Sequence, residues 1–170
     1  MIAAALRRSL HVGQRIPRTE LVLVSPNGFS YDIEAHVSTD TFFSEKKVVL
    51  VGFPGAFTPV CHKEHLPGFV SQAEAFKAKG ATLLGLAVND PFTLKEFGEE
   101  LAGSLSFIAD GTAALTRSLD AGIDLTEQCL GYRTRRFTAL VEDGVITVLN
   151  DENSHKLTEV STAETILKAL

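Results

Sequence analysis

The pattern of apolar and polar residues changes along the chain: short, largely apolar runs are separated by segments in which apolar residues recur every three or four positions. Residues 47–53 are largely apolar and rich in β-branched side chains, and they end at Pro54, which predicts a buried strand. Residues 81–88 predict a second buried strand, and residues 105–109 predict a shorter one. The first of these runs is far too short to cross a bilayer, so we expect no membrane partner.

Helical periodicity fills the intervals between these strands. Residues 59–79 carry apolar side chains at spacings of three and four, which predicts a long helix. Pro67 lies inside this segment, so we expect a kink or a break one turn into the helix. Asp90 and Pro91 predict the N-cap and the first residue of a second helix, and residues 112–119 predict a third.

The last part of the chain predicts a hairpin and a final helix. Residues 137–141 and 145–149 flank Glu142-Asp143-Gly144, a sequence typical of a β-turn. Ser161-Thr162-Ala163-Glu164 has the spacing of a capping box and predicts the start of the C-terminal helix. The order of these elements predicts an α/β fold, a three-layer domain with a central mixed β-sheet flanked by helices. A thioredoxin-like sheet satisfies this order, although the order alone does not single it out.

Composition narrows the classes of function. The chain has 170 residues, 45% of them hydrophobic and 22% charged, which suits one domain with a substantial core. Its 16 basic and 21 acidic residues give a formal net charge of -5, which argues against nucleic-acid binding. The 2 cysteines cannot form the disulfide framework of a small secreted protein, so we expect an intracellular protein with reduced thiols.

The amino-terminal segment differs in composition from the rest of the chain. Residues 1–19 contain four arginines and no acidic residue. This composition is typical of a mitochondrial presequence, and an ordinary chain terminus is the alternative. We therefore assign residues 1–11 to an N-terminal extension and residues 12–170 to the domain, and we expect a cytoplasmic or mitochondrial protein.

The segment with the clearest chemical signal is residues 54–61, Pro-Gly-Ala-Phe-Thr-Pro-Val-Cys, between the first buried strand and the long helix. Sites of open α/β sheets gather at such strand ends. With Pro59 as the first helical residue, Thr58 is the predicted N-cap. Cys61 then lies in the first turn, where unpaired N–H groups and the helix dipole favour a thiolate. The dipole supplies only about 1–2 kcal/mol, so a second cationic or hydrogen-bonding group is needed.

Three arginines just before the predicted hairpin offer that second group: Arg133, Arg135 and Arg136. A small buried packing residue is the alternative interpretation of Cys61. His62 and His65 follow Cys61, but these ligands are too few for zinc, and we expect no metal. Glu64 stands where a disulfide reductase has its second cysteine. No glycine-rich phosphate loop follows a predicted strand, so we expect no nucleotide cofactor.

Residues 54–61, their continuation His65-Leu66-Pro67-Gly68-Phe69 and the segments 87–92, 135–137 and 163–170 resemble the peroxiredoxins. The similarity is to the type II, or peroxiredoxin-5-like, subgroup, and it covers residues 12–170. It implies a thioredoxin-like fold. It also implies a thiol-dependent peroxidase that reduces hydrogen peroxide and alkyl hydroperoxides through a cysteine thiolate and a sulfenic acid intermediate.

The resemblance also implies roles for individual residues. Cys61 corresponds to the peroxidatic nucleophile, and Pro54 shields the thiolate. Thr58 hydrogen-bonds the sulfur and the peroxide, and Arg136 is the catalytic arginine, with Arg133 and Arg135 as nearby alternatives. We expect three further residues at the substrate pocket: Phe57, Leu130 and, beneath the site, His65.

The chain departs from its type II relatives at the second cysteine. Leu84-Gly85-Leu86 stands where many of them carry it, and the remaining thiol is Cys129. We therefore expect a one-cysteine mechanism in which glutathione with glutaredoxin, or thioredoxin, is the reductant and no cofactor is needed. Cys129 as a resolving residue is the alternative, as is a packing role for it. The resemblance suggests a homodimer, and a redox sensor or relay acting through Cys61 is the competing function.

Overall fold

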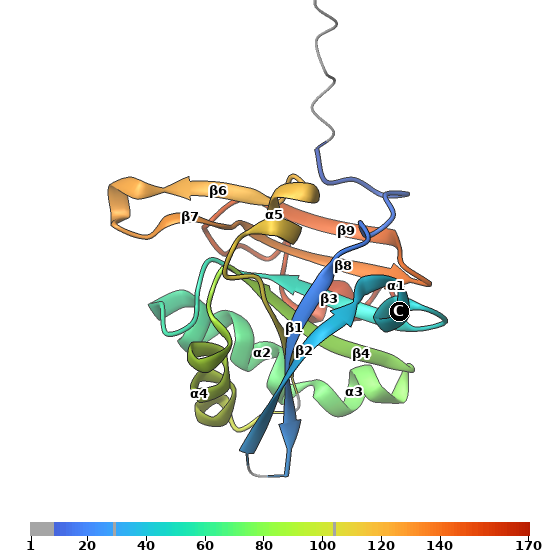
Figure 1. Ribbon diagram of the computed structural model, residues 1–170. Helices are drawn as coiled ribbons and strands as arrows, with labels where there is room; N and C mark the ends of the chain where they lie inside the picture. Colours follow the sequence, from blue (N-terminus) through green and yellow to red (C-terminus); the bar gives the residue numbers. More distant parts are fainter. Residues whose placement is uncertain (1–8, 29, 104) are drawn as a thin grey trace, which may run out of the picture.

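A mixed seven-stranded sheet forms the centre of the computed structural model, which describes residues 9–28, 30–103 and 105–170 (Figure 1). Its strand order is β2-β1-β5-β4-β3-β8-β9. The strands are β1 (Glu20–Asn27), β2 (Ser30–Ser38), β3 (Lys47–Gly52), β4 (Ala81–Ala87), β5 (Ser106–Ala109), β8 (Arg136–Glu142) and β9 (Val145–Ser154). The three central strands β3, β4 and β5 are parallel, whereas the flanking pairs are antiparallel.

Helices cover both faces of the sheet. They are α1 (Thr39–Phe43), α2 (Leu66–Ser71), α3 (Ala73–Ala78), α4 (Pro91–Leu101), α5 (Ala114–Ser118) and α6 (Ala163–Leu167). Val49 and Val51 of β3 pack with residues of α2, α3, α4 and α6, and the alternate residues Val48 and Leu50 pack with residues of α1 and α5. Each such fully buried side chain contributes about 1.5–3 kcal/mol to the stability of the fold, relative to the same side chain exposed to water. The predicted three-layer α/β domain with a mixed sheet is confirmed.

The segment predicted as one long helix is divided. A π-helical turn, η1 (Cys61–His65), precedes α2, and the N–H of Leu66 bonds to the carbonyl of Cys61. Pro67 has no N–H for the carbonyl of residue 63, and its ring crowds that carbonyl, so the wider turn accommodates it. The irregularity predicted from Pro67 is therefore present, and it takes the form of the π-helical turn that precedes the proline.

A second break lies at Gln72, between α2 and α3, and the sequence does not predict it. Phe69 and Phe76, on either side of the break, stack with ring centroids 5.9 Å apart in the same core. The hydrophobic pattern is therefore the same with or without the interruption.

The predicted helix starts are correct for α4 and shifted by one residue for α6. The Asp90 carboxylate accepts a hydrogen bond from a first-turn N–H of α4 at 2.9 Å, as a capping residue does. For α6 the cap is Thr162, whose hydroxyl accepts from the N–H of Thr165, and not Ser161. Ser161 donates its hydroxyl to the carboxylate of Glu152 at 2.8 Å, a charged and therefore stronger acceptor.

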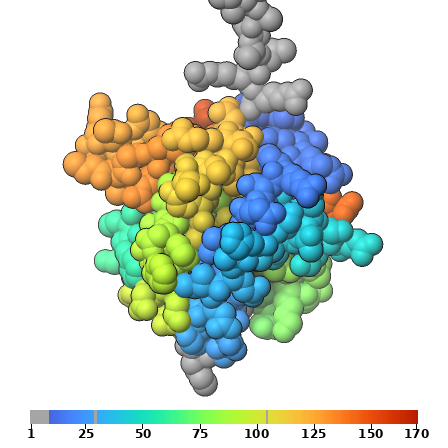
Figure 2. Space-filling view, in the orientation of Figure 1, coloured from blue at the N-terminus to red at the C-terminus, as the bar shows by residue number. Residues whose placement is uncertain are grey.

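Two hairpins are absent from the prediction. One is the β1–β2 pair at the sheet edge. The other joins β6 (Gly122–Leu125) and β7 (Gly131–Thr134) through the 3-10 turn η2 (Thr126–Gln128), and it projects from the body of the molecule in Figures 1 and 2. The strands of the second hairpin, β6 and β7, have four residues each and so carry too few positions for a clear alternation of apolar and polar residues.

The predicted N-terminal extension is described only from Ser9 onward, so most of the proposed presequence lies outside the described residues. Leu10 is 4% exposed and belongs to the apolar cluster that also contains Ile16. None of the helices that the structure describes is long and apolar enough to span a membrane.

Candidate active site

The loop after β3 delivers Cys61 to the edge where the central strands end. Because β3 and β4 are parallel neighbours, the residues that follow them lie side by side, and the N–H of Ala56 bonds to Oδ1 of Asn89 at 3.0 Å. The N–H of His62 bonds to the carbonyl of Thr58 at 2.9 Å. Cys61 therefore lies in the first helical turn, where the helix dipole favours an anion.

Arg136, the first residue of β8, lies against Cys61. Its side chain is 1% exposed and makes three hydrogen bonds. Nη2 donates to Sγ of Cys61 at 3.4 Å, Nη1 donates to Nδ1 of His65 at 2.8 Å, and Nε donates to the carbonyl of His155 at 3.1 Å. The guanidinium plane is fixed by contacts on three sides.

The charge of this arginine has no carboxylate partner among the described residues. The ion pairs present there involve other cations, namely Arg18, Lys47, His62, Lys95 and Arg135. A buried cation without an opposing charge is costly, and the sulfur is the group in contact with it that can become an anion. The arrangement therefore places beside the sulfur the cation that the first-turn position alone lacks.

His65 is a neutral acceptor behind the arginine. Burial, with the nearby charge of Arg136, lowers the pKa of His65 to about 3, and the opposing effects of Ser161 and Glu152 do not offset this. An arginine can only donate, so Nδ1 accepts and Nε2 carries the proton that it donates to the carbonyl of Ser161 at 3.0 Å. Both ring nitrogens are thus occupied, which leaves neither for a metal.

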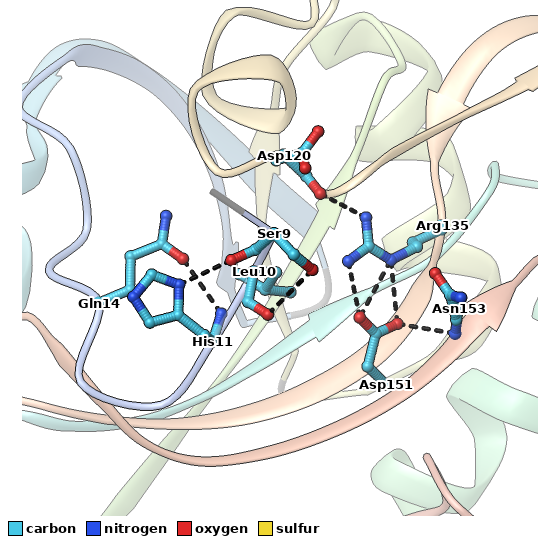
Figure 3. A network of polar contacts seen from close by, with 8 residues as sticks. All are labelled: Ser9, Leu10, His11, Gln14, Asp120, Arg135, Asp151 and Asn153. Carbon is cyan, nitrogen blue, oxygen red and sulfur yellow. Dashed lines mark hydrogen bonds and ion pairs between the residues drawn. The ribbon is translucent and has the colours of Figure 1, made fainter. Parts of the chain in front are cut away.

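The other two arginines do not reach the sulfur. Arg135 forms a bidentate ion pair with Asp151, with Nη2–Oδ2 at 2.6 Å, and donates to the carbonyl of Asp120 (Figure 3). Arg133 donates to the carbonyl of Leu130 at 2.7 Å and to that of Pro54 at 3.4 Å. Arg133 therefore links the β6–β7 hairpin to the loop that precedes Cys61.

A cavity of about 160 Å³ opens beside the sulfur. It is lined by Pro54, Thr58, Pro59, Val60, Leu125, Leu130, Arg136 and His155. The hydroxyl of Thr58 donates to the carbonyl of Gly55 at 2.8 Å, so its oxygen is left to accept a hydrogen bond from a ligand rather than to donate one to the sulfur. Cys61 itself is 0% exposed.

The predicted pocket residues have different positions. Leu130 lines the cavity, whereas His65 lies behind Arg136. Phe57 lies outside the cavity: it is 43% exposed, and its ring packs edge-on against His62 and Phe97. Cys129 is exposed in the turn after η2, directly before Leu130, with φ 59°.

Several residues of the site escape sequence reasoning. Leu125 and His155 line the cavity, and Asn89 braces the loop before Cys61. Arg133 braces the same loop, whereas the sequence singles it out only as an alternative partner of the sulfur. Asn89 follows β4 directly, and its place after a buried strand next to β3 is a signal that could have identified it. His155 and Leu125 come from irregular or short segments, for which the pattern carries no such signal.

Comparison with known proteins decides the family. The chain matches the Redoxin family over residues 11–167. It is 45% identical to peroxiredoxin-2C of Oryza sativa subsp. japonica over 137 residues, which cover 79% of this chain and 84% of the relative. The chain is a peroxiredoxin. This peroxiredoxin is also 35% identical to the chloroplastic peroxiredoxin-2E of Arabidopsis thaliana over 167 residues, 95% of this chain and 70% of that one.

Solved structures agree with this assignment. The peroxiredoxin superposes on reduced Prx3 from Vibrio vulnificus in complex with hydrogen peroxide with a TM-score of 0.83 at 38% identity, covering 94% of this chain and 99% of that one. The predicted thioredoxin-like fold is thereby confirmed. Peroxiredoxins are thiol peroxidases, and this chain is a thiol peroxidase that uses a hydroperoxide and a thiol reductant.

Proposed function

We propose that this peroxiredoxin reduces hydrogen peroxide and alkyl hydroperoxides at Cys61 and relies on an external thiol, with no other cofactor, to regenerate it. The observation that carries the proposal is the 3.4 Å hydrogen bond from the buried guanidinium of Arg136 to Sγ. The positive charge of Arg136 stabilises a thiolate in the proposed resting state. The same charge lies where negative charge develops on the departing oxygen during the reaction.

The first half of the cycle oxidises the sulfur. The thiolate of Cys61 attacks the peroxide oxygen that bears the proton, so an S–O bond forms and the O–O bond breaks. The sulfur becomes a sulfenic acid, and the other oxygen leaves as hydroxide or alkoxide and takes a proton from water. Arg136 stabilises the leaving oxygen, and Thr58 accepts the hydrogen bond that orients the peroxide. Pro54 forms part of the wall that shields the sulfur.

The substrate range follows from the lining of the cavity. Five residues of the lining are apolar, namely Pro54, Pro59, Val60, Leu125 and Leu130, and three are polar, namely Thr58, Arg136 and His155. An alkyl substituent can pack against the apolar residues while the peroxide group meets Arg136 and Thr58. Organic hydroperoxides are therefore accepted beside hydrogen peroxide.

The second half of the cycle requires a thiol from outside the chain. Cys61 is buried in η1, and Cys129 is exposed on the projecting hairpin. The turn that holds Cys129 is tied by its own backbone, through the bonds of Cys129 N–H to the Thr126 carbonyl and of Leu130 N–H to the Leu125 carbonyl. Forming a Cys61–Cys129 disulfide would require the two sulfurs to approach to about 2 Å.

Glutathione is the reductant that we infer. Its thiolate attacks the sulfenic sulfur, so that an S–S bond forms and the S–O bond breaks; the hydroxide that leaves takes a proton from solvent to become water, and a mixed disulfide remains on Cys61. A second thiol, from glutaredoxin or another glutathione, attacks that disulfide and returns Cys61 to the thiol. Thioredoxin is the alternative donor.

The experiment compares the wild type, Cys61→Ser and Cys129→Ser in peroxide consumption, with glutathione plus glutaredoxin or with thioredoxin. We expect turnover with the glutathione system in wild type and Cys129→Ser, and none in Cys61→Ser. Mass analysis after peroxide treatment without reductant should find sulfenic acid on Cys61. A Cys61–Cys129 disulfide, with loss of turnover in Cys129→Ser, would contradict the one-cysteine cycle. Stoichiometric oxidation without turnover by either donor would favour a redox sensor.

Assembly and location complete the proposal. Two chains associate as a homodimer, and the exposed aromatic rings of Phe57 and Phe92 support this because such surface gains from being covered. Light scattering of the wild type and of Phe92→Ser tests it. The location that we propose is the cytoplasm or the mitochondria, and fusing the N-terminal extension, residues 1–11, to a fluorescent protein distinguishes the two.

A further inference from the structure

The segment between β9 and α6 has no regular secondary structure, yet it supplies two acceptors to the active site. The carbonyl of His155 accepts from Nε of Arg136, and the carbonyl of Ser161 accepts from His65, which in turn accepts from Arg136. The orientation of the guanidinium therefore depends on where residues 155–161 hold these two carbonyl groups.

The backbone of this loop is held by side chains. Among the described residues, the N–H groups of Lys156 and Val160 donate to hydroxyls of residues 154 and 158. The N–H groups of Thr158 and Ser161 donate to the carboxylate of Glu152, at 2.9 and 3.1 Å. A loop without backbone ladder bonds takes its shape from such local acceptors.

Glu152 is the centre of this arrangement. Besides the two N–H groups, it accepts the hydroxyls of Ser161 at 2.8 Å and of Thr158 at 2.7 Å, four hydrogen bonds in all. Burial opposes its ionisation, but these hydrogen bonds outweigh burial and hold the pKa of Glu152 below its usual value, so the carboxylate is charged at neutral pH. Charged acceptors make the stronger hydrogen bonds.

We propose that Glu152 is a positioning residue for the peroxidase reaction, because it fixes the loop whose carbonyl groups at His155 and Ser161 aim Arg136 at the sulfur. Among the described residues, the hydrogen bonds of Glu152 go to Thr158 and Ser161, and Glu152 is not part of the cavity lining. It acts through the loop on His65 and Arg136. The inference rests on the peroxidase activity of Cys61 and is independent of the thiol that later reduces it.

The test measures only the oxidation of Cys61, in a Cys129→Ser background in which Cys61 is the single thiol. Two rate constants are compared, for hydrogen peroxide and for the neutral alkylating reagent iodoacetamide. Both reagents require the thiolate, but only the peroxide needs a cation at its departing oxygen. The ratio of the two rate constants therefore reports the aim of Arg136, which a general loss of stability does not change.

We expect Glu152→Ala to lower this ratio about 10-fold or more, since small misplacements of a catalytic group carry large kinetic penalties. Glu152→Gln keeps a carbonyl acceptor for the two N–H groups and should recover most of the ratio. Glu159→Ala, in the same loop, removes a carboxylate that makes no hydrogen bond to a described residue and should match the wild type. An unchanged ratio in Glu152→Ala would overturn the proposal.

A double-mutant cycle with Arg136→Lys tests whether the effect passes through the guanidinium. In that background Glu152→Ala should change the ratio by less than about 2-fold, because the group that Glu152 aims is gone. If the double variant instead lowered the ratio by the product of the two single-variant factors, the proposed route through Arg136 would be contradicted. If Glu152→Ala does not fold, Ser161→Ala serves instead, since it removes one hydrogen bond to Glu152 and keeps the carbonyl that His65 uses. It should lower the ratio in the same direction, and no change in it would also overturn the proposal.

Discussion

Cys61 and His65 accept hydrogen bonds from the two terminal nitrogens of one guanidinium group, at 3.4 Å and 2.8 Å. They are the first and last residues of the π-helical turn η1, which presents both side chains to Arg136. One end of the guanidinium thus contacts the reactive sulfur, and the other is held by a buried ring that does not take up a proton at neutral pH.

Replacing Arg136 should damage the reaction and leave the fold intact. Lysine keeps a charge but loses the planar group that bonds to three partners at once. We expect Arg136→Lys to lower the rate constant for oxidation of Cys61 by peroxide about 10²–10³-fold. Stopped-flow measurement of that step checks this. Arg135→Lys is the matched control: its ion pair with Asp151 lies away from the sulfur, so its rate constant should stay close to the wild type.

The hydroxyl of Thr58 is expected to matter more than its methyl group. Thr58 lines the cavity, and Thr58→Val removes its hydroxyl together with the bond to the Gly55 carbonyl. We expect about a 10²-fold loss in the peroxide rate constant for valine and a small loss for serine, which keeps the oxygen. Equal losses in Thr58→Ser and Thr58→Val would mean that the side chain acts by packing.

Burial of neutral His65 predicts a pH-dependent stability. The folded-state pKa of about 3 lies below the ordinary value of 6.5, so between these pH values the unfolded chain binds a proton that the folded protein does not. The contribution of neutral His65 to the free energy of unfolding is therefore complete above pH 6.5, and it is lost as the pH falls towards 3. By pH 4.5 the loss is on the order of 2 kcal/mol.

Urea unfolding of the wild type and His65→Gln at pH 7 and pH 4.5 isolates this effect. Glutamine can accept from Arg136 and donate to Ser161 but does not titrate in this range. The variant should lose less stability than the wild type on acidification. Parallel losses in the two proteins would show that His65 is not buried in its neutral form.

The two thiols should differ in access. Cys129 is exposed and Cys61 is fully buried, so a bulky aromatic disulfide reagent should modify Cys129 at once and Cys61 slowly in the native protein. Denaturant should make the two rates similar. Counting modified thiols against time, with Cys129→Ser for assignment, measures this. Rapid modification of both thiols in the native protein would be the contrary result.

The sequence predicts the elements that carry a strong period and the residues that carry chemistry. The three parallel strands, the cap at Asp90 and the place of Cys61 at the start of a helix follow from local pattern. Which of Arg133, Arg135 and Arg136 contacts the sulfur does not follow from local pattern, and only the family resemblance selects Arg136. Arg135 directly precedes β8 and Arg136 begins it; neighbouring side chains of an extended segment point to opposite sides, so the start of the strand separates the two arginines.

The less regular parts of the site were out of reach for a different reason. Glu152 lies in an edge strand, and its significance comes from a loop whose N–H groups converge on one carboxylate. Thr162 replaces Ser161 as the cap of α6 because Glu152 already holds the serine hydroxyl. Such outcomes depend on tertiary contacts, and spacing along the chain does not encode them.

The buried guanidinium of Arg136, which has no carboxylate partner among the described residues, ties the redox state of the protein to its thermal stability. In the proposed cycle, oxidation converts the thiolate to an uncharged sulfenic acid, which removes the negative partner of Arg136 while the guanidinium stays out of water. The oxidised form should therefore melt at a lower temperature than the reduced form, which calorimetry on the two forms can compare. Because the reduced form is the more stable one, the gain in folding stability adds to the driving force for reduction of Cys61. The fold itself therefore favours completion of each catalytic cycle.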